Sequence, residues 1–508
     1  MDSDFETQPS EDSAVDPVEG AGEAPETTQP QEEAPVPSFF SRTPENDPAE
    51  EEAEAEPGDS MSAFISRTMT AVAEHEPDDE GHLLPRAPRS FTEVGLSKAF
   101  LTDLTLKIIH YSGTPSMAQL VRRLGLNPDI VSQLLTALSE DRLVEVMSQS
   151  DLYTGNYRYR LSERGQTRVQ EALERTRYAG PAPVTAEQYT ETMKRVLERP
   201  LDEGARAHVK AVLNDLVLSP DVSDAIARAL FSGKPALFYG PSGNGKTVLL
   251  EKFAEDMGGL TIVPYAIYAY GQVIRVFDQS IHKPVETPDD GSNGKDETKR
   301  DRRWVAIKRP AIVVGAEMDR DALELGYDPA SKFYQAPAHM KAQNGTLVID
   351  DFGRQRIDTH QLLTRWLIPL ERAWDSVTLN TGEKLTYPFR VQPLFATNAN
   401  VNELADEALL RRILYKVRVS GPDRSAFGEI LRRECLARRV RVTEGALEHV
   451  LESLFSHPEI EVRGSHVGDI VEILIQSAAY DGKEPVLDNE SFDRVFSLFL
   501  ATAGTDGR

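Results

Sequence analysis

The sequence predicts an α/β fold in which a parallel β-sheet is flanked by helices. Three observations support this prediction. A glycine-rich segment, 240–247, follows the apolar strand Ala236–Tyr239 and precedes the apolar helical stretch Val248–Phe253. One apolar run ends in paired acids at 350–351, and another ends in Thr-Asn at 397–398. Apolar strands with polar residues at their carboxyl ends are typical of parallel sheets that carry a site along that edge.

The glycine-rich segment matches the G-x-x-x-x-G-K-[S/T] phosphate-binding loop at every fixed position. Its residues are Gly240, Pro241, Ser242, Gly243, Asn244, Gly245, Lys246 and Thr247. The glycines let successive backbone N–H groups turn toward phosphate oxygens, and the helix that follows adds partial positive charge. We expect Lys246 to reach the β- and γ-phosphates and Thr247 to hold Mg²⁺ through its hydroxyl. A chance glycine-rich turn is the alternative.

The paired acids follow the apolar-leaning strand 345–349. Downstream of a phosphate loop, such a strand brings carboxylates to the edge of the sheet beside the nucleotide. Asp350 is expected to hold Mg²⁺, directly or through water, and Asp351 to orient and deprotonate the attacking water. Taken alone, the pair is also compatible with two solvated acids at the end of a strand.

With two further segments, the chain resembles the AAA+ ATPase superfamily over about Ser219–Ala503. The strand 392–398 ends in Thr-Asn, and the segment 408–413 contains adjacent arginines. The resemblance implies that ATP is the nucleotide, that Asn398 is the sensor-1 residue, and that Arg411 or Arg412 is an arginine finger. Such a finger completes a neighbour's site, so a ring is implied, usually a homohexamer. A surface ion pair is the alternative for the arginines. The branch, chaperone-like (MoxR-like) or helicase-related, stays open.

The chain departs from the family pattern in two places. The family usually places Glu after the Mg²⁺-binding Asp, whereas this chain has Asp351, whose shorter side chain implies slower hydrolysis. The family also places a sensor-2 arginine before an Asp-hydrophobic pair in the lid. Here Gly468 stands at that position, and Arg463 is the candidate substitute for contacting the nucleotide.

We predict five regions along the chain. They are a disordered acidic tail (1–90), a winged-helix-like domain (91–180), a helical linker (181–218), an ATPase core (219–420) and an α-helical lid (421–508). Within the core we expect the next strand after the phosphate-loop helix at about 260–268 and an exposed polar insertion at 284–303. The aromatic stretch Tyr265–Tyr270 is expected to pack in the core, with pore lining as the alternative.

The acidity of the chain is concentrated in its tail. The net charge is −26, and the first 80 residues contain 24 acidic but only two basic side chains, which leaves the rest close to neutral. With few large apolar residues, this stretch is expected to be disordered. The segment 38–43 (SFFSRT) is repeated in similar form at 63–68 (AFISRT). The repeat is either a coincidence or a duplicated motif that binds a partner, gaining avidity from two copies.

Residues 91–180 read as three helices, a β-hairpin and a further helix, the order of a winged helix-turn-helix. Residues 95–180 contain eleven Lys or Arg and nine Asp or Glu, which is little positive charge for a duplex binder. Arg158 and Arg160 share one face of the hairpin. DNA contact and docking of a protein client or adaptor therefore both stay open.

The remaining composition favours a soluble, cytoplasmic protein without membrane insertion. Cys435 is the one cysteine, so no intrachain disulfide forms, and no apolar stretch reaches the roughly 18 residues of a membrane span. The leading function is ATP-driven remodelling of a protein or protein complex, with recruitment by the N-terminal regions. The alternatives are a nucleic-acid motor or ATP-regulated DNA-binding protein, and a nucleotide switch that does not hydrolyse.

Overall fold

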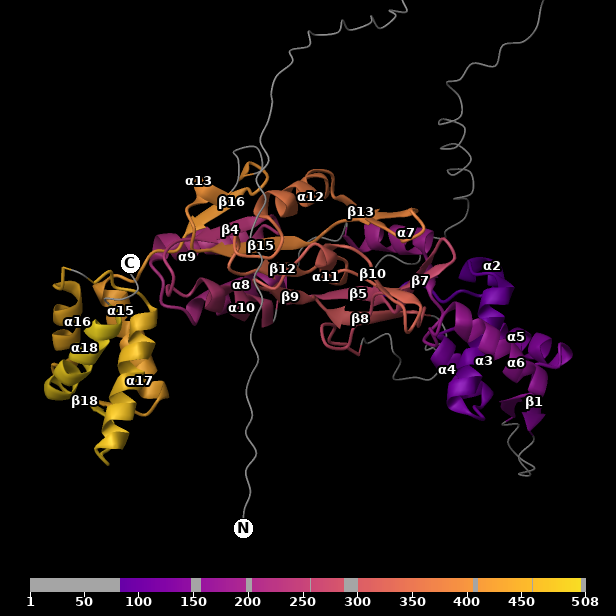
Figure 1. The fold of residues 1–508 in the computed structure, drawn as a ribbon, viewed down its shortest axis with the longest axis horizontal. Coiled ribbons are helices and arrows are strands. Elements are labelled where there is room, and N and C mark those ends of the chain that lie inside the picture. The colour runs from indigo at the N-terminus through magenta and orange to yellow at the C-terminus, as the bar shows by residue number, and fades with distance from the viewer. Residues whose placement is uncertain are drawn as a thin grey trace, which may run out of the picture. The chain divides into compact units, whose positions relative to one another are not determined.

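The computed structural model describes residues 83–147, 157–197, 203–255, 257–286, 300–404, 410–458 and 460–503 (Figure 1). The acidic tail up to residue 82, including both copies of the repeated segment, lies outside the described residues. Its expected disorder and partner binding therefore stay predictions.

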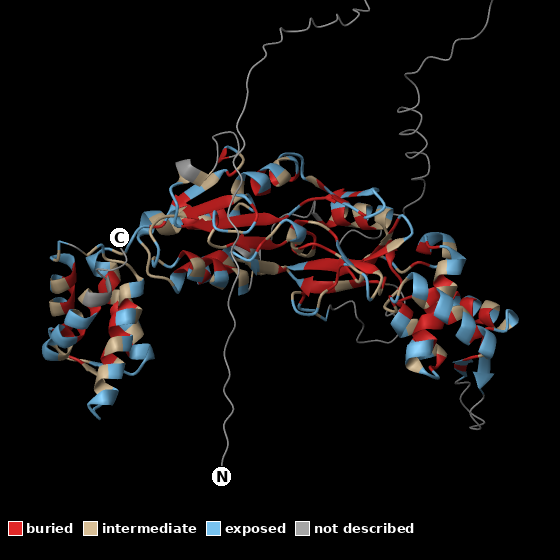
Figure 2. Ribbon diagram, viewed as in Figure 1, coloured by how far each residue is buried: buried red, intermediate tan, exposed pale blue. Residues whose placement is uncertain are grey.

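A five-stranded parallel sheet forms the nucleus of the α/β region, in the order β16-β4-β15-β12-β9. The strands are β4 (Ala236–Tyr239), β9 (Ala311–Val314), β12 (Thr346–Ile349), β15 (Gln392–Thr397) and β16 (Tyr415–Arg418). Every pairing in this sheet is parallel, so the carboxyl ends of the strands meet at one edge. β12 and β15 are buried at every residue, as expected where helices cover both faces (Figure 2). The predicted α/β fold with a helix-flanked parallel sheet is confirmed.

The two faces of this sheet pack into separate apolar cores. On one face lie α8 (Glu203–Asn214), α9 (Pro220–Phe231) and α10 (Lys246–Glu255), against side chains such as Phe238. On the other face lie α11 (Ala338–Lys341) and α12 (Thr359–Arg372), against Leu237 and Phe395. Neighbouring strand residues such as Leu237 and Phe238 thus point to opposite faces, as the pleat requires.

The predicted strand at 260–268 is present as two short strands, and both lie outside this sheet. The segment forms β5 (Leu260–Pro264) and β6 (Ala266–Ala269), which pair antiparallel with β8 (Trp304–Lys308) and β7 (Gln272–Arg275). The sheet resumes only at β9. An apolar run of this length fits either sheet, and the antiparallel partners that decide the matter come later in the chain.

A further apolar core lies largely outside the central sheet and includes the first helix of the expected linker. It joins β5, β6, β7 and β8 to α7 (Ala186–Leu197), β13 (Trp374–Thr378) and β14 (Lys384–Pro388). Tyr189 of α7 is almost fully buried there, and its ring stacks on Trp304 at 6.2 Å between centroids. The remaining short strands are β3 (Val184–Thr185), β10 (Gly326–Asp328), β11 (Phe333–Gln335), β17 (Arg441–Val442) and β18 (Val486–Leu487).

The aromatic stretch at the β6–β7 hairpin mostly packs inward. Tyr265 packs against the core that includes α7, and Tyr268 contacts Phe100 with 4.6 Å between ring centroids. Tyr270 is exposed at the turn, and its hydroxyl donates to the carbonyl of Lys384. Core packing therefore accounts for two of the three tyrosines.

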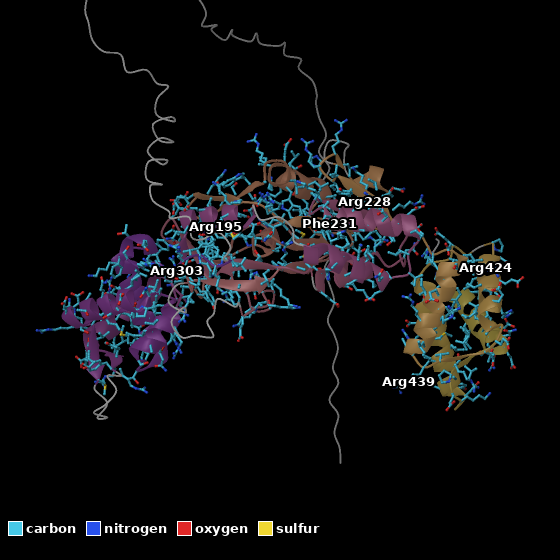
Figure 3. The ribbon with its side chains drawn as sticks, turned by 180° about the vertical axis from the view of Figure 1, so that it is seen from behind. Arg195, Arg228, Phe231, Arg303, Arg424 and Arg439 are labelled. Carbon is cyan, nitrogen blue, oxygen red and sulfur yellow. The ribbon has the colours of Figure 1, made fainter. Side chains whose placement is uncertain are left out.

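Part of the segment expected as an exposed insertion is deeply buried. Residues 287–299 lie outside the described residues, but Asp301 and Arg303 are only 2% and 3% exposed (Figure 3). Arg303 binds both carboxylate oxygens of Asp301 and donates to the carbonyl of Val94. The expectation of exposure is wrong for these two residues, because each supplies the charge that makes burial of the other tolerable.

The N-terminal region begins with a short helix that the sequence did not predict, and the predicted elements then follow in order. The elements are α2 (Phe91–Val94), α3 (Lys98–Ser112), α4 (Met117–Leu124), α5 (Pro128–Glu140), β1 (Val144–Met147), β2 (Arg158–Leu161) and α6 (Glu163–Arg175). Ser116 begins α4 with a capping box, and Asn127 accepts a hydrogen bond from Asp129 N at the start of α5. The assignment of these elements to a winged helix stays a prediction.

Four helices form the C-terminal region. They are α15 (Arg424–Ala437), α16 (Ala446–Phe455), α17 (Ser465–Tyr480) and α18 (Asn489–Ala503), packed around one apolar core. All four lie where the sequence places them. Within the described ranges, none of the helices has both the length and the apolar character needed to cross a bilayer.

Candidate nucleotide-binding site

The phosphate loop connects β4 to α10 in the conformation that its sequence predicts. Gly240, Gly243 and Gly245 all have positive φ (143°, 78° and 81°), which side chains disfavour. At Gly240, a Cβ atom would overlap the carbonyl oxygen of Val419, which follows β16. Glycine at this position therefore lets the loop leave β4 directly beside the neighbouring strand.

Lys246 lies at the base of the loop and is buried. Its Nζ donates to the carbonyls of Gly240 (2.9 Å) and Pro241 (2.8 Å). Burial lowers the pKa of Lys246, and the carboxylates of Asp350 and Asp351 offset part of that effect. The ammonium is thus held inside the loop by carbonyls that a phosphate can replace.

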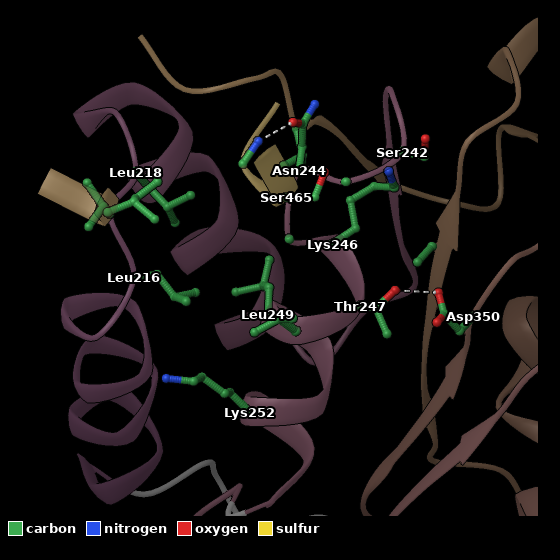
Figure 4. Close-up of a pocket in the computed structure, with 18 of the residues that line it drawn as sticks. Leu216, Leu218, Ser242, Asn244, Lys246, Thr247, Leu249, Lys252, Asp350 and Ser465 are labelled. Atoms are coloured by element: carbon green, nitrogen blue, oxygen red, sulfur yellow. Dashed lines mark hydrogen bonds between the residues drawn. The ribbon is translucent and has the colours of Figure 1, made fainter. Parts of the chain in front are cut away.

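Thr247 and Asp350 form a pair with the chemistry of a Mg²⁺ site. The Thr247 hydroxyl donates to Asp350 Oδ1 at 3.1 Å (Figure 4). Among the residues that the structure describes, no group of three or more His, Cys, Asp or Glu is arranged to hold a metal by itself. Mg²⁺ commonly takes one or two protein ligands and completes its shell with phosphate oxygens and water. The hydroxyl and carboxylate oxygens fit that requirement.

Asp351 follows in an unusual backbone conformation. Its φ of 47° lies in the left-handed region, which is uncommon for a residue other than glycine. Asn398, just after β15, donates through Nδ2 to Asp351 Oδ1 at 3.3 Å. The Gln355 amide donates to the carbonyls of both Asp350 and Asp351. The strained turn is therefore held from two sides, and sequence reasoning missed Gln355 because an isolated glutamine has no distinguishing pattern.

One cavity of about 660 Å³, a size typical of ligand pockets, is lined by Lys246, Thr247, Asp350, Asp351 and Asn398. Beyond the phosphate loop, the cavity continues between two segments that sequence reasoning did not assign to the site. These segments are 216–218, which connects α8 to α9, and the face of α15 that includes Ile430, Arg433 and Ala437. Arg433 donates to the carbonyl of Asp215 at 3.3 Å and thus connects the two segments. The polar end suits phosphates, and the apolar end suits a planar base.

The two candidate finger arginines lie away from this cavity. Arg412 donates to Glu371 of α12 at 3.3 Å, and neither Arg411 nor Arg412 is among the residues that line the cavity. The site within one chain is therefore built without them.

Arg463, the candidate lid contact, does not line the cavity either. Its guanidinium lies 3.6 Å from Glu461. The next two residues, Gly464 and Ser465, do line the cavity, and their backbone N–H groups bind the phosphate loop. The C-terminal helices thus contact the phosphate loop through backbone groups next to Arg463, and contact of Arg463 with a nucleotide stays a prediction.

Comparisons with known proteins give limited similarity. Residues 423–498 match a family model described as "Domain of unknown function (DUF8689)". No curated protein matches the sequence.

Three solved structures are similar at low identity. A RuvB mutant from Thermotoga maritima has a TM-score of 0.34 and 11% identity, covering 56% of this chain and 72% of that one. A second RuvB mutant has a TM-score of 0.34 and 10% identity, covering 56% and 70%. NtrX from Brucella abortus has a TM-score of 0.32 and 11% identity, covering 64% of this chain and 59% of its own length. At these TM-scores the likeness carries no argument, and the fold assignment rests on the strand pairing described above.

Proposed function

We propose that this chain is a Mg²⁺-dependent, ATP-hydrolysing ATPase of the AAA+ type that acts as a ring and remodels a protein or protein complex. One observation carries the proposal. The phosphate loop, the Thr247–Asp350 pair and the Asp351–Asn398 pair all line the same cavity at the carboxyl edge of the parallel sheet. That arrangement provides separate groups for phosphates, metal and water.

Each group has a distinct task in this proposal. The loop N–H groups and Lys246 neutralise phosphate charge, and Thr247 with Asp350 holds Mg²⁺. The metal supplies charge stabilisation at the transferring phosphoryl group when bound. Asp351 orients the attacking water and accepts its proton, while Asn398 fixes one oxygen of that carboxylate.

Replacement of the loop lysine tests the assignment. Lys246→Ala removes the cation of the loop, so ATP turnover is expected to fall at least about 100-fold. The matched control is Lys234→Ala, which removes an exposed lysine just before β4 and is expected to retain wild-type turnover. Phosphate release by the full chain with Mg²⁺ and ATP is the measurement. Wild-type turnover in Lys246→Ala contradicts the site.

The position of the arginine pair supports completion of the site by a neighbour. If Arg411 or Arg412 acts across a subunit boundary, then Asp351→Asn and the double variant Arg411→Ala/Arg412→Ala are each inactive alone. Mixed subunits regain activity, because an intact site then meets an intact arginine pair. In a random one-to-one mixture, an intact Asp351 faces an intact arginine pair at about a quarter of the subunit boundaries. No recovery in the mixture, with both variants assembled, contradicts the shared site.

The surface of the β1–β2 hairpin supports protein recruitment over DNA binding. Arg160 is paired with Glu145 at 2.6 Å, and Arg158 donates to the carbonyl of Thr114. Large apolar side chains are exposed on the same hairpin: Val146, Met147 and Tyr157. Capture with Asp351→Asn in ATP is expected to retain a protein client that is lost without residues 1–180. Salt-dependent duplex binding that disappears in Arg158→Ala/Arg160→Ala supports the nucleic-acid alternative instead.

A further inference from the structure

We propose that Asn244 is a positioning residue that latches the lid helix α17 onto the phosphate loop and so couples lid closure to nucleotide binding. This inference rests on the proposed function for its consequence, but the latch itself is a contact within the protein.

The helix α17 begins without a side-chain cap of its own. Its N-cap residue, Gly464, has no side chain to accept a hydrogen bond, and its φ and ψ are −61° and −34°. The first N–H groups of any helix lack partners within the helix. Two such groups find acceptors on the phosphate loop. Gly464 N donates to Asn244 Oδ1 at 3.2 Å (Figure 4), and Ser465 N donates to the Gly243 carbonyl at 2.7 Å.

Asn244 therefore supplies, from a distant part of the chain, an acceptor for the N–H of the N-cap residue of α17. Asparagine is among the best N-cap residues because its side-chain oxygen reaches free N–H groups at a helix start. An N-cap residue normally stands directly before its helix, whereas Asn244 lies 220 residues away from Gly464. The phosphate loop thus supplies an acceptor to an N–H group that has no partner within the lid helix.

The surroundings of this contact leave no room for larger residues. A Cβ atom at Gly243 would overlap Ser465 Oγ, and a Cβ atom at Gly421 would overlap the Val462 carbonyl oxygen. The same Cβ atom at Gly421 would lie 3.7 Å from Asn244 Oδ1, an ordinary contact distance. Glycines on both chain segments therefore permit the close approach on which the two hydrogen bonds depend.

The latch connects lid and nucleotide through one loop. In the proposed function the loop N–H groups bind phosphates, while the Gly243 carbonyl and the Asn244 side chain bind the lid. A ligand that orders the loop favours the closed lid, and a closed lid favours the ligand by the same factor. This arrangement gives the lid a route to sense nucleotide without Arg463 in the cavity.

Amide hydrogen exchange of the full chain, read on peptides that cover residues 463–468, tests the latch. In Asn244→Ala without nucleotide, we expect exchange of these amides to become about fivefold faster, the effect of losing one cap. We also expect KM for ATP to rise by a similar factor.

Three further variants test whether an acceptor at position 244 is what protects these amides. Asn244→Asp keeps an acceptor and is expected to exchange like the wild type. Ser465→Pro removes the other amide donor at a first helical position, where proline is favoured, and is expected to exchange faster. Asn127→Ala removes the cap of α5, a matched loss elsewhere, and is expected to leave residues 463–468 unchanged.

The outcomes distinguish the latch from the ATPase assignment. Unchanged exchange at 463–468 in both Asn244→Ala and Ser465→Pro overturns the latch, even if ATP turnover is normal. Equal loss of protection in Asn244→Asp and Asn244→Ala also overturns it, since an acceptor is then not what matters. Faster exchange in Asn244→Ala together with no ATP binding by the wild type supports the latch and refutes the proposed function.

Discussion

The carboxyl edge of the central sheet and the buried cluster around Asp375 both contain carboxylates, but the carboxylates differ in their partners. At the sheet edge, Asp350 accepts from Thr247, and Asp351 accepts a long bond from Asn398, beside an open cavity. In the buried cluster, Asp375 is 4% exposed. Its bonding partners come from three different elements: Arg365 of α12, Tyr387 of β14 and His339 of α11.

This difference separates groups that hold the structure from groups that remain available to a ligand. A buried charge is tolerable when its neighbours satisfy its hydrogen bonds, and such a carboxylate has no capacity left for chemistry. The acids at the sheet edge keep oxygen lone pairs directed at a cavity. Replacing an acid in each region is therefore expected to damage different properties, activity in one and stability in the other.

The largest expected effect is on turnover at the sheet edge. Asp351→Asn removes the carboxylate that we propose as the proton acceptor but keeps the size of the side chain, so kcat is expected to fall by about 10³-fold. Because the carboxylate is not buried among saturated partners, the melting temperature and the Kd for ATP are expected to stay near wild type. Single-turnover hydrolysis and ATP titration provide the measurement. A kcat above one tenth of wild type contradicts the role of Asp351.

A comparable effect, on stability alone, is expected for the buried ion pair between Asp301 and Arg303. Asp301→Ala leaves the Arg303 guanidinium buried without its carboxylate, so the free energy of unfolding is expected to fall by about 3 kcal/mol. The matched control is Asp224→Ala, which removes the partner of Arg228 in an exposed ion pair and is expected to cost much less stability. Urea unfolding of both variants measures the two losses in unfolding free energy. Equal losses contradict the expectation that the buried pair contributes more than the exposed pair.

The same contrast explains what the sequence predicts well. The strands β4, β12 and β15 are short apolar runs followed by polar residues. Because a phosphate loop follows β4, the sequence predicts that these strands belong to one parallel sheet. Asp350, Asp351 and Asn398 directly follow β12 and β15, and Lys246 and Thr247 begin α10, after the loop that leaves β4. Since carboxyl ends of parallel strands share an edge, their meeting at one cavity follows from local patterns, and their catalytic roles stay predictions.

Other parts of the site and fold depend on contacts that no local pattern reveals. The carbonyl of Asp215, directly before the segment 216–218, accepts from Arg433 of α15, which lies 218 residues further along the chain. Asp301 and Arg303 stand in a polar stretch that looks exposed, and nothing nearby in the sequence indicates their burial. Likewise, α7 looks like a connecting helix until its partners in β8 and β14 are known.

The smallest expected effect is a loss of folding stability at low pH, which we expect from the buried cluster around Asp375. Burial by itself raises the pKa of Asp375, but hydrogen bonds from His339 and Arg365 outweigh burial and lower the pKa to about 2. A carboxyl with a lowered pKa stabilises the folded state when ionised. That stability is present above the unfolded pKa, near 4, and is lost as pH falls toward 2.

Asp375→Asn tests this contribution, because the amide keeps the shape but cannot ionise. The wild type is expected to lose about 2 kcal/mol of stability between pH 4 and pH 2 through this group. The difference in unfolding free energy between wild type and Asp375→Asn should therefore narrow by about that amount across the window. Urea unfolding at several pH values measures it. A constant difference contradicts the idea that this carboxylate is held ionised by its partners, and with it the contrast between a saturated buried acid and the available acids at the sheet edge.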